Sequence, residues 1–234
     1  MADHLGEAYL RYSFTKGTDQ EVAFLIETLA LQPGMRVLDV GCGPGRHAHA
    51  LAKQGVVVHG IDISARFVAL ARGQAPAGAT FERMDARSLA FTNEFDAVIS
   101  LCQGGFGLLG RVEDGAADDD VIVGMARALK LGGRVAISAF SAYFAVRHLE
   151  TTDTFDVASG VNHEVSELRS ETGDRAQFDL WTSCFTPREL RDLIRRAGLS
   201  VDSLWSVTPG AYAQNTPDLA HPEFLVIAHR TADV

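Results

Sequence analysis

The chain has 234 residues and 47% of them are hydrophobic, so a disordered chain is excluded and one sizeable core is expected. The formal net charge of -9 gives no basic field that would gather nucleic acid or an anionic membrane, which favours a small-molecule partner. The three cysteines are widely spaced, which predicts reduced thiols. We also see no leader-like N-terminus and no long apolar run, so we expect a cytoplasmic protein without a membrane span.

Short apolar runs alternate with amphipathic segments, which is typical of an α/β fold with a parallel sheet covered on both faces. We expect buried strands at residues 35–40, 56–61, 79–83, 95–101 and 133–139. A helix is expected at 120–130. Its start carries Asp118, Asp119 and Asp120, and negative charge is favourable there, so this acidic triplet indicates a helix N-terminus rather than a metal site.

The C-terminal part contains the clearest helix and three strand-rich stretches. Residues 150–185 interrupt the alternation with two strands around a turn at 171–174, which predicts an inserted β-hairpin. In the helix expected at 186–198, Thr186 suits the N-cap and Glu189 the capping-box position. Residues 199–207 and 223–230 are expected to be two strands joined by a turn-rich segment, as an antiparallel hairpin that closes one edge of the sheet.

The stretch VLDVGCGPGR reads as a strand, a tight glycine turn and a helix start, an arrangement that brings backbone amides to a nucleotide. A dinucleotide site requires G-x-G-x-x-G, but Arg46 stands where the third glycine belongs. A phosphate loop is excluded because no G-K-[ST] follows. Asp62 ends the next strand, where a carboxylate can accept hydrogen bonds from both ribose hydroxyls. These features predict a nucleoside ligand without a phosphate chain.

Five segments in this order resemble the class I S-adenosylmethionine-dependent methyltransferases, in particular those acting on small molecules: VLDVGCGPG, GIDIS, RMDARSL, FDAVIS with LCQGG, and LKLGGRVAIS. The resemblance covers roughly residues 20–140, and the 186–198 helix more loosely. It implies a Rossmann-like, mostly parallel seven-stranded sheet with helices on both faces. It also implies S-adenosylmethionine as cofactor and direct displacement of its methyl group by a nitrogen, oxygen or carbon nucleophile.

The same resemblance implies a single methyltransferase domain over residues 1–234. Residues 1–20 would form an N-terminal lid, and the insertion at about 150–185 would be a hairpin on the substrate side. Family members that methylate bases in nucleic acids carry N/D-P-P-F/Y after the fourth strand. This chain has Cys102-Gln103-Gly104-Gly105 there, so we expect no nucleic-acid substrate. The oligomeric state is left open.

Carried over by position, the resemblance implies a cofactor site made of Asp39, Gly41, Cys42, Gly43, Gly45, Asp62, Ile63, Asp85, Ala86, Leu101 and Cys102. The three glycines would let the backbone approach the methionine and ribose, and Asp39 would orient the loop or reach the ammonium group through water. Asp62 would hold the ribose. Ile63 would pack on adenine.

The remaining cofactor contacts come from the next two loops. Asp85 with Ala86 would read the edge of adenine, although a loop aspartate is often only a turn former. The backbone at Leu101 and Cys102 would face the ammonium group. The N-terminal residues expected to fold over the cofactor are Tyr12, Thr15 and Lys16.

No motif fixes a catalytic residue. An amine needs only to lose a proton, whereas a hydroxyl or carbon acid usually needs a general base. The candidates are Gln103, His148, His163 and Tyr12, together with Glu164 and Tyr212. Candidate aromatic walls facing a sulfonium are Tyr12, Phe106 and Trp181. No metal is expected, because His47 and His49 lie two residues apart on a helix and point to different faces.

The glycine-rich stretch LCQGGFGLLG at 101–110 lacks the basic and hydroxyl groups of a phosphate cradle, and strand and helix patterns flank it, which excludes a linker. We expect it to be a wall between cofactor and acceptor, with Gln103 and Phe106 facing the substrate. Two other functions stay open at this point: a nicotinamide-dependent oxidoreductase using the same glycine turn, and a non-catalytic S-adenosylmethionine-binding protein.

Overall fold

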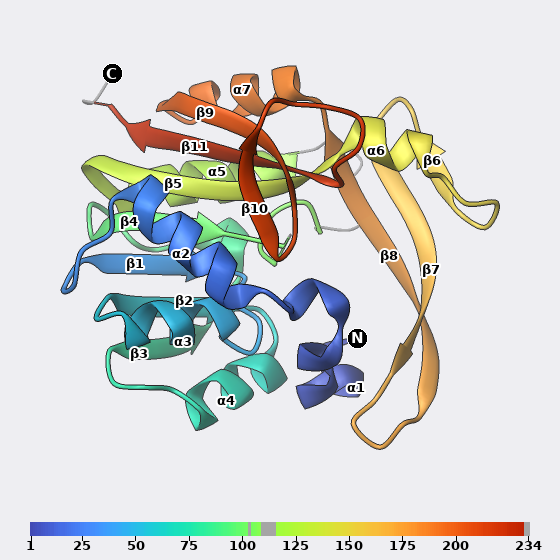
Figure 1. The fold of residues 1–234 in the computed structure, drawn as a ribbon, viewed down its shortest axis with the longest axis horizontal. Helices are drawn as coiled ribbons and strands as arrows, with labels where there is room; N and C mark the ends of the chain where they lie inside the picture. Colours follow the sequence, from blue (N-terminus) through green and yellow to red (C-terminus); the bar gives the residue numbers. More distant parts are fainter. Residues whose placement is uncertain (103, 109–115, 232–234) are drawn as a thin grey trace.

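The computed structural model describes residues 1–102, 104–108 and 116–231 (Figure 1). Within them the longest run of paired strands has the order β10-β9-β11-β5-β4-β1-β2-β3 in a sheet of eleven strands. Neighbours from β3 to β5 are parallel. Their bounds are Arg36–Val40 for β1, Val57–Asp62 for β2, Ala79–Arg83 for β3, Phe95–Ser100 for β4 and Leu129–Ser141 for β5. The Rossmann-like, mostly parallel sheet is confirmed.

Helices cover both faces of this sheet, and each face has its own apolar cluster. Because side chains alternate along a strand, Val37 faces one cluster while Leu38 faces the other. One face carries α2 (Thr18–Leu29), α3 (Arg46–Lys53) and α4 (Ala65–Gly73). The other carries α5 (Ala116–Ala128) and α7 (Pro187–Arg196). The 3₁₀ turn Ala86–Ser88 follows β3.

The start of α5 differs from the helix expected at 120–130. The helix begins at Ala116, so Asp118 and Asp119 lie in its first turn. The carboxylate of Asp118 is buried and accepts a hydrogen bond of 2.9 Å from the amide of Gly107. A helix N-terminus is thus confirmed for this acidic stretch, and one of its members also fixes the glycine-rich loop after β4. The strand expected from residue 133 begins earlier, at Leu129.

At the opposite edge the chain adds antiparallel strands. β9 (Leu199–Thr208) and β11 (Glu223–Arg230) pair antiparallel, as expected, with β11 between β9 and β5. The turn-rich segment between them contains a further strand, β10 (Ala211–Asn215), that pairs with β9. Gln20 of α2 exchanges two hydrogen bonds with the backbone of Tyr212, which holds β10 against that helix. α7 starts with the expected capping box between Thr186 and Glu189.

The insertion after β5 forms the predicted hairpin. It contains α6 (Ala142–Arg147), β6 (Thr154–Asp156), β7 (Val161–Arg169) and β8 (Arg175–Phe185), with β7 and β8 antiparallel over their length. The end of β8 also pairs with the end of β5, so the hairpin continues from the carboxyl edge of the main sheet. No helix in the described part of the chain is long and apolar enough to span a bilayer.

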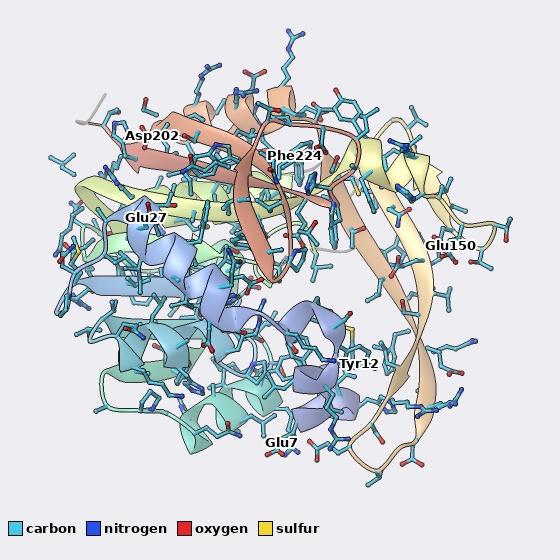
Figure 2. All side chains as sticks on the ribbon, viewed as in Figure 1. Glu7, Tyr12, Glu27, Glu150, Asp202 and Phe224 are labelled. Carbon is cyan, nitrogen blue, oxygen red and sulfur yellow. The ribbon has the colours of Figure 1, made fainter. Side chains whose placement is uncertain are left out.

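The N-terminal segment consists of α1 (Ala2–Leu5) and the 3₁₀ turns Gly6–Arg11 and Ser13–Thr15. It lies between the parallel strands and the hairpin (Figure 1). The hydroxyl of Tyr12 accepts a hydrogen bond of 3.0 Å from the amide of Arg169 on β7 (Figure 2). This segment therefore bridges the two parts that flank the candidate site.

Candidate active site

The glycine loop between β1 and α3 adopts the backbone that its sequence predicts. Gly41, Gly43 and Gly45 have φ values of 74°, 54° and 86°, in the left-handed region that favours glycine. A Cβ on Gly41 would lie 2.0 Å from the carbonyl carbon of Gly104, so this glycine is required by the loop after β4. At Gly43 the nearest atom to such a Cβ is Cε1 of Tyr9, at 3.9 Å. The glycine loop therefore leaves room for a ligand next to Gly43.

Asp62, at the end of β2, connects this loop to the next strand. Its two carboxylate oxygens accept hydrogen bonds from the amides of Gly43 at 2.9 Å and Ser64 at 2.8 Å. Burial raises its pKa, while the two amides oppose that shift. Ser64 caps α4 by accepting a hydrogen bond from the amide of Phe67. Next to Asp62, the side chain of Ile63 is 60% exposed.

Asp39 is a buried acid beneath the glycine loop. Its side chain is 2% exposed, and Oδ2 accepts no hydrogen bond within the described residues. The pKa of Asp39 is raised to about 7, mainly by burial. The nearby Asp62 adds to this rise, and Arg46 opposes it. A buried carboxylate oxygen without a donor fits a ligand that brings a positively charged group to this place.

The other two cofactor segments predicted from the sequence have local partners. Asp85 caps the turn Ala86–Ser88 through the amide of Arg87 and also pairs with the Arg87 guanidinium, which lowers the pKa of Asp85. Its turn-forming role is thus observed. Leu101 is buried. Cys102 has a φ of 50°, and its amide donates to Oγ of Ser138 at 2.8 Å.

A buried ionic network that the sequence reasoning missed stabilises the loop from behind. Glu21 of α2 is 0% exposed and accepts from Arg46 and from Nε2 of His47, the latter at 2.7 Å. Its other oxygen accepts from the amide of Gly210 at 2.7 Å. Burial by itself raises the pKa of Glu21, but His47 and Arg46 outweigh it and lower the pKa. Arg46 also donates to Sγ of Cys102 at 2.8 Å.

This network explains why Arg46 takes the place of the third glycine. The sequence offered one sign of this network: a charged residue, Arg46, stands in a turn that is expected to be buried, and a buried charge needs a partner of opposite charge. His49 has a different partner from His47, the carbonyl oxygen of Ala71, so the two histidines are directed to different neighbours as predicted.

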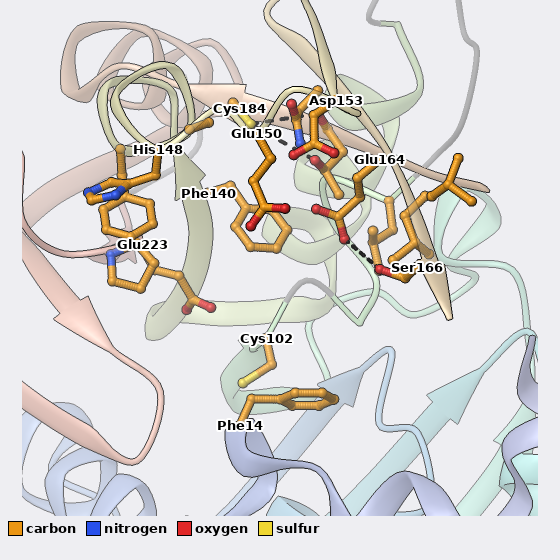
Figure 3. A pocket seen from close by; sticks show the side chains of 18 of the residues that line it. Phe14, Cys102, Phe140, His148, Glu150, Asp153, Glu164, Ser166, Cys184 and Glu223 are labelled. Carbon is orange, nitrogen blue, oxygen red and sulfur yellow. Dashed lines mark hydrogen bonds between the residues drawn. The ribbon is translucent and has the colours of Figure 1, made fainter. Parts of the chain in front are cut away.

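A cavity of about 730 Å³ adjoins the loop, bounded by the N-terminal segment, α6, the hairpin and the ends of β5 and β11 (Figure 3). It falls within the range of small-molecule sites. Two of its residues, Tyr9 and Cys102, also lie beside the glycine loop. Burial raises the pKa of the Tyr9 hydroxyl, with Cys102, Asp62 and Asp39 adding to that rise and Arg46 opposing it. Tyr9 is the N-terminal residue over Gly43 that the sequence reasoning missed.

The structure separates the predicted catalytic candidates. Tyr12, His148 and Glu164 line the cavity. The candidate His163 is not among the described residues that line the cavity: it is the neighbour of Glu164 on β7, and alternation turns it to the other face. There its ring stacks on Trp181 with the ring centroids 3.8 Å apart, and its Nε2 lies 2.7 Å from Oδ1 of Asp179, within hydrogen-bond distance. Trp181 is consequently not an aromatic wall.

Two further candidates belong to the core. Phe106 is 0% exposed, belongs to one of the two core clusters and stacks on Phe185 at 5.0 Å, so the expected aromatic wall is wrong. Tyr212 is 3% exposed and belongs to the other cluster, where burial raises its pKa. Thr15 donates to backbone carbonyls of its own segment. Gln103 lies outside the described residues.

Comparisons with known proteins agree with this arrangement. A model of the methyltransferase domain family matches residues 31–186. The chain is 30% identical over 188 residues to the ubiquinone biosynthesis O-methyltransferase of Thiobacillus denitrificans, covering 78% of this chain and 72% of that protein. It is 29% identical to the enzyme of the same name from Roseobacter denitrificans, covering 71% of this chain and 60% of that protein.

Two solved structures share the fold. The CcbJ methyltransferase of Streptomyces caelestis aligns over 99% of this chain and 98% of its own, with a TM-score of 0.80 and 20% identity. CalS10, an amino pentose methyltransferase from Micromonospora echinaspora solved with bound S-adenosylmethionine, aligns over 96% of both chains with a TM-score of 0.69 and 23% identity. The chain therefore belongs to the class I S-adenosylmethionine-dependent methyltransferases and transfers a methyl group from S-adenosylmethionine to a small-molecule acceptor.

Proposed function

We propose that the cavity beside β7 and β8 is the acceptor site and that S-adenosylmethionine lies across the glycine loop, with its methyl group directed toward Cys102. The observation that carries this proposal is the shared boundary: Tyr9 lies over Gly43 and lines the cavity, and Cys102 contacts Arg46 of the loop and lines the same cavity. A cofactor over Gly43 would thus reach the acceptor without crossing another wall.

The residues beneath the loop fit this cofactor. The buried Oδ2 of Asp39 offers an acceptor for its ammonium group, directly or through water, and Asp62 has lone pairs beyond its two backbone bonds for the ribose. Exposed Ile63 offers apolar area for adenine, with Asp85 and Ala86 at its edge. When bound, S-adenosylmethionine supplies an electrophilic methyl group on a positively charged sulfur.

The protein would then contribute by positioning the acceptor against the methyl group and by excluding water from the site. Tyr9 and Phe14 would close the site from the N-terminal side, in the lid role proposed for residues 1–20. Glu164 and His148 line the cavity and can accept a proton if the acceptor is a hydroxyl. The ubiquinone biosynthesis relatives are named O-methyltransferases, whereas CalS10 is named for an amino sugar, so the names of similar proteins are compatible with an oxygen or a nitrogen acceptor.

The wider setting is also a proposal. We place the enzyme in the cytoplasm, on the basis of its three free thiols at Cys42, Cys102 and Cys184. The whole chain from 1 to 234 would act as one methyltransferase domain with its hairpin on the substrate side. The acidic character of the chain argues against nucleic acid as substrate. The comparisons do not favour a nicotinamide oxidoreductase or a non-catalytic binding protein.

A cavity-filling substitution tests the acceptor site. Leu180 on β8 lines the cavity, and Leu180→Trp should abolish methyl transfer to the first acceptor found in a labelled-methyl metabolite screen. Affinity for S-adenosylhomocysteine, measured by calorimetry, should stay within about twofold because the cofactor loop is untouched. Gln177→Trp is the matched control, on the same strand at an exposed position. Unchanged transfer by Leu180→Trp would place the acceptor elsewhere, and a screen without any labelled product would favour a binding protein.

A further inference from the structure

Among the described charged side chains that line the cavity, carboxylates predominate; the groups there that can carry a positive charge are the α-amino group of Met1 and the imidazole of His148. Its described lining includes the carboxylates of Glu150, Asp153, Glu164 and Glu223 and no lysine or arginine. These acids come from separate parts of the chain: the loop after α6, β7 and the start of β11. Three carboxylates, those of Glu150, Glu164 and Glu223, extend into the space opposite Cys102 and Phe14 (Figure 3). The described acids therefore favour a positively charged group in the space where an acceptor would bind.

The acids differ in depth. Glu223 is 2% exposed, Glu164 is half-buried, and Glu150 is exposed at the mouth. One oxygen of Glu164 accepts a hydrogen bond of 3.0 Å from Oγ of Ser166, which fixes the side chain on the cavity face of β7. A charge held at reduced exposure interacts more strongly with an ion than one in open water. Carboxylates therefore lie at both buried and exposed positions of the lining.

Two further features of the wall bear on the kind of ligand that would fit. Aromatic rings of Phe14, Tyr12 and Phe140 line the cavity, and ring faces attract ammonium ions. The side-chain oxygen of Asn162 is buried without a hydrogen-bond donor among the residues that the structure describes, and Asn162 also lines the cavity. Such an oxygen requires a donor, which an ammonium or amine N–H supplies as well as a hydroxyl does, so the rings and not this oxygen favour a cation.

We propose that the acceptor is a primary or secondary amine that is methylated on nitrogen, an inference that rests on this cavity being the acceptor site. The amine enters as its ammonium ion and releases one proton to water. The nitrogen lone pair then forms a bond to the methyl carbon as the carbon–sulfur bond breaks and leaves its electron pair on sulfur. The positive charge passes from sulfur to the methylated nitrogen, and the carboxylates stabilise it there.

A hydroxyl acceptor would experience the opposite effect. It must lose its proton to become a strong nucleophile, and neighbouring carboxylates disfavour the resulting oxyanion by like-charge repulsion. The same four acids that stabilise a cationic product therefore oppose an anionic nucleophile. The charge of the site therefore favours nitrogen at the product stage, where the methylated group is a cation.

Matched pairs of probes test the proposal by equilibrium binding. Benzylamine, cyclohexylamine and phenethylamine, all cationic at pH 7, are titrated into the protein with and without S-adenosylhomocysteine, beside benzyl alcohol, cyclohexanol and phenethyl alcohol. We expect the best amine to bind at least about tenfold more tightly than its alcohol. Glu164→Gln and Glu150→Gln should each reduce that preference by about threefold to tenfold, because each removes one partly screened charge. Glu167→Gln, which removes an exposed charge of β7 paired with Arg175, should leave it unchanged.

The outcomes separate this inference from the proposed function. Equal binding of amines and alcohols, no measurable amine binding, or a preference unaltered in Glu164→Gln and Glu150→Gln would overturn it. A larger loss of affinity for S-adenosylmethionine than for S-adenosylhomocysteine in these variants would also overturn it, because the acids would then serve the sulfonium. A protein that binds no S-adenosylhomocysteine but retains the amine preference would refute the cofactor placement while supporting the cation-binding site.

Discussion

Asp39 contributes to stability in a pH-dependent way that is unusual for a carboxylate. Its pKa of about 7 in the folded protein lies above the ordinary value, so the folded state binds this proton more tightly than the unfolded chain. The free energy of unfolding contributed by Asp39 is therefore greatest below about pH 4 and decreases as pH rises toward 7, by up to about 1.4 kcal/mol per pH unit.

Asp39→Asn should remove that decrease. Denaturant unfolding between pH 4.5 and about 7.5 should show a flatter pH dependence for the variant than for the wild type, with the exposed Asp19→Asn as control. Parallel curves for the wild type and Asp39→Asn would show that this carboxyl ionises normally.

Glu21 is the residue on which the loop scaffold depends most. Glu21→Gln leaves the guanidinium of Arg46 buried with its carboxylate partner gone, which typically costs about 3 kcal/mol. Glu27→Gln, on an exposed position of the same helix, should change the free energy of unfolding by less than about 0.5 kcal/mol. A loss below about 1 kcal/mol for Glu21→Gln in urea unfolding would mean that the network contributes little.

Individual site residues were predictable where a motif fixes them to the end of a parallel strand. Gly43 and Asp62 are where the sequence places them, because the carboxyl ends of β1 and β2 meet at one edge. His163 and Glu164 were not separable, because a hairpin pattern gives the strands but not the face that turns to a cavity. Glu21 and Tyr9 come from segments without a motif and act through tertiary contacts.

At the scale of elements, the hairpin and the N-terminal segment are joined at the hairpin tip. Glu171 accepts from the amide of Glu7 and pairs with Arg66 of α4 at 3.0 Å, while Nε2 of His4 lies 3.1 Å from the carbonyl oxygen of Leu168. These contacts join the N-terminal segment and α4 to the hairpin. The two Glu171 contacts are exposed, so each contributes little to global stability.

Glu171→Ala should therefore loosen the N-terminal segment without unfolding the protein. We expect limited trypsin cleavage after Arg11 and Lys16 to accelerate about threefold or more, while the melting temperature changes by less than about 2 °C. Glu167→Ala, whose ion pair with Arg175 stays within the hairpin, is the control. Equal cleavage rates in the two variants would show that the tip contacts do not hold the segment.

Element types were more predictable than their limits. The capping box of α7 and the turn of the hairpin carry local signals that match their structures. β10 was missed because its residues lie between turn formers, and its pairing with β9 and contact with α2 arise only in the folded chain. The helix α5 begins at Ala116, earlier than expected, because Asp118 and Asp119 lie within its first turn rather than before it.

At the scale of the whole molecule, the proposed cofactor site lies along one half of the sheet edge, and the added hairpin would supply the proposed acceptor site. The parallel strands bring Asp39, Gly43 and Asp62 together, and the continuation of β5 into β8 places Glu164 and its neighbours across from them. Fold and cofactor class followed from the ordered motifs. The acceptor chemistry did not, because the cavity combines residues that lie far apart in the sequence, from the N-terminal segment to the start of β11.

The most direct test of this account is a calorimetric titration of S-adenosylhomocysteine into the wild type, Ile63→Asp and Leu131→Asp. Ile63 and Leu131 are 60% and 59% exposed, so neither substitution disturbs the core. We predict 1:1 binding to the wild type, about tenfold weaker binding to Ile63→Asp because apolar contact with adenine is lost, and wild-type affinity for Leu131→Asp. No binding to the wild type, or equal affinities for all three proteins, would contradict the placement of the cofactor at the ends of β1 and β2.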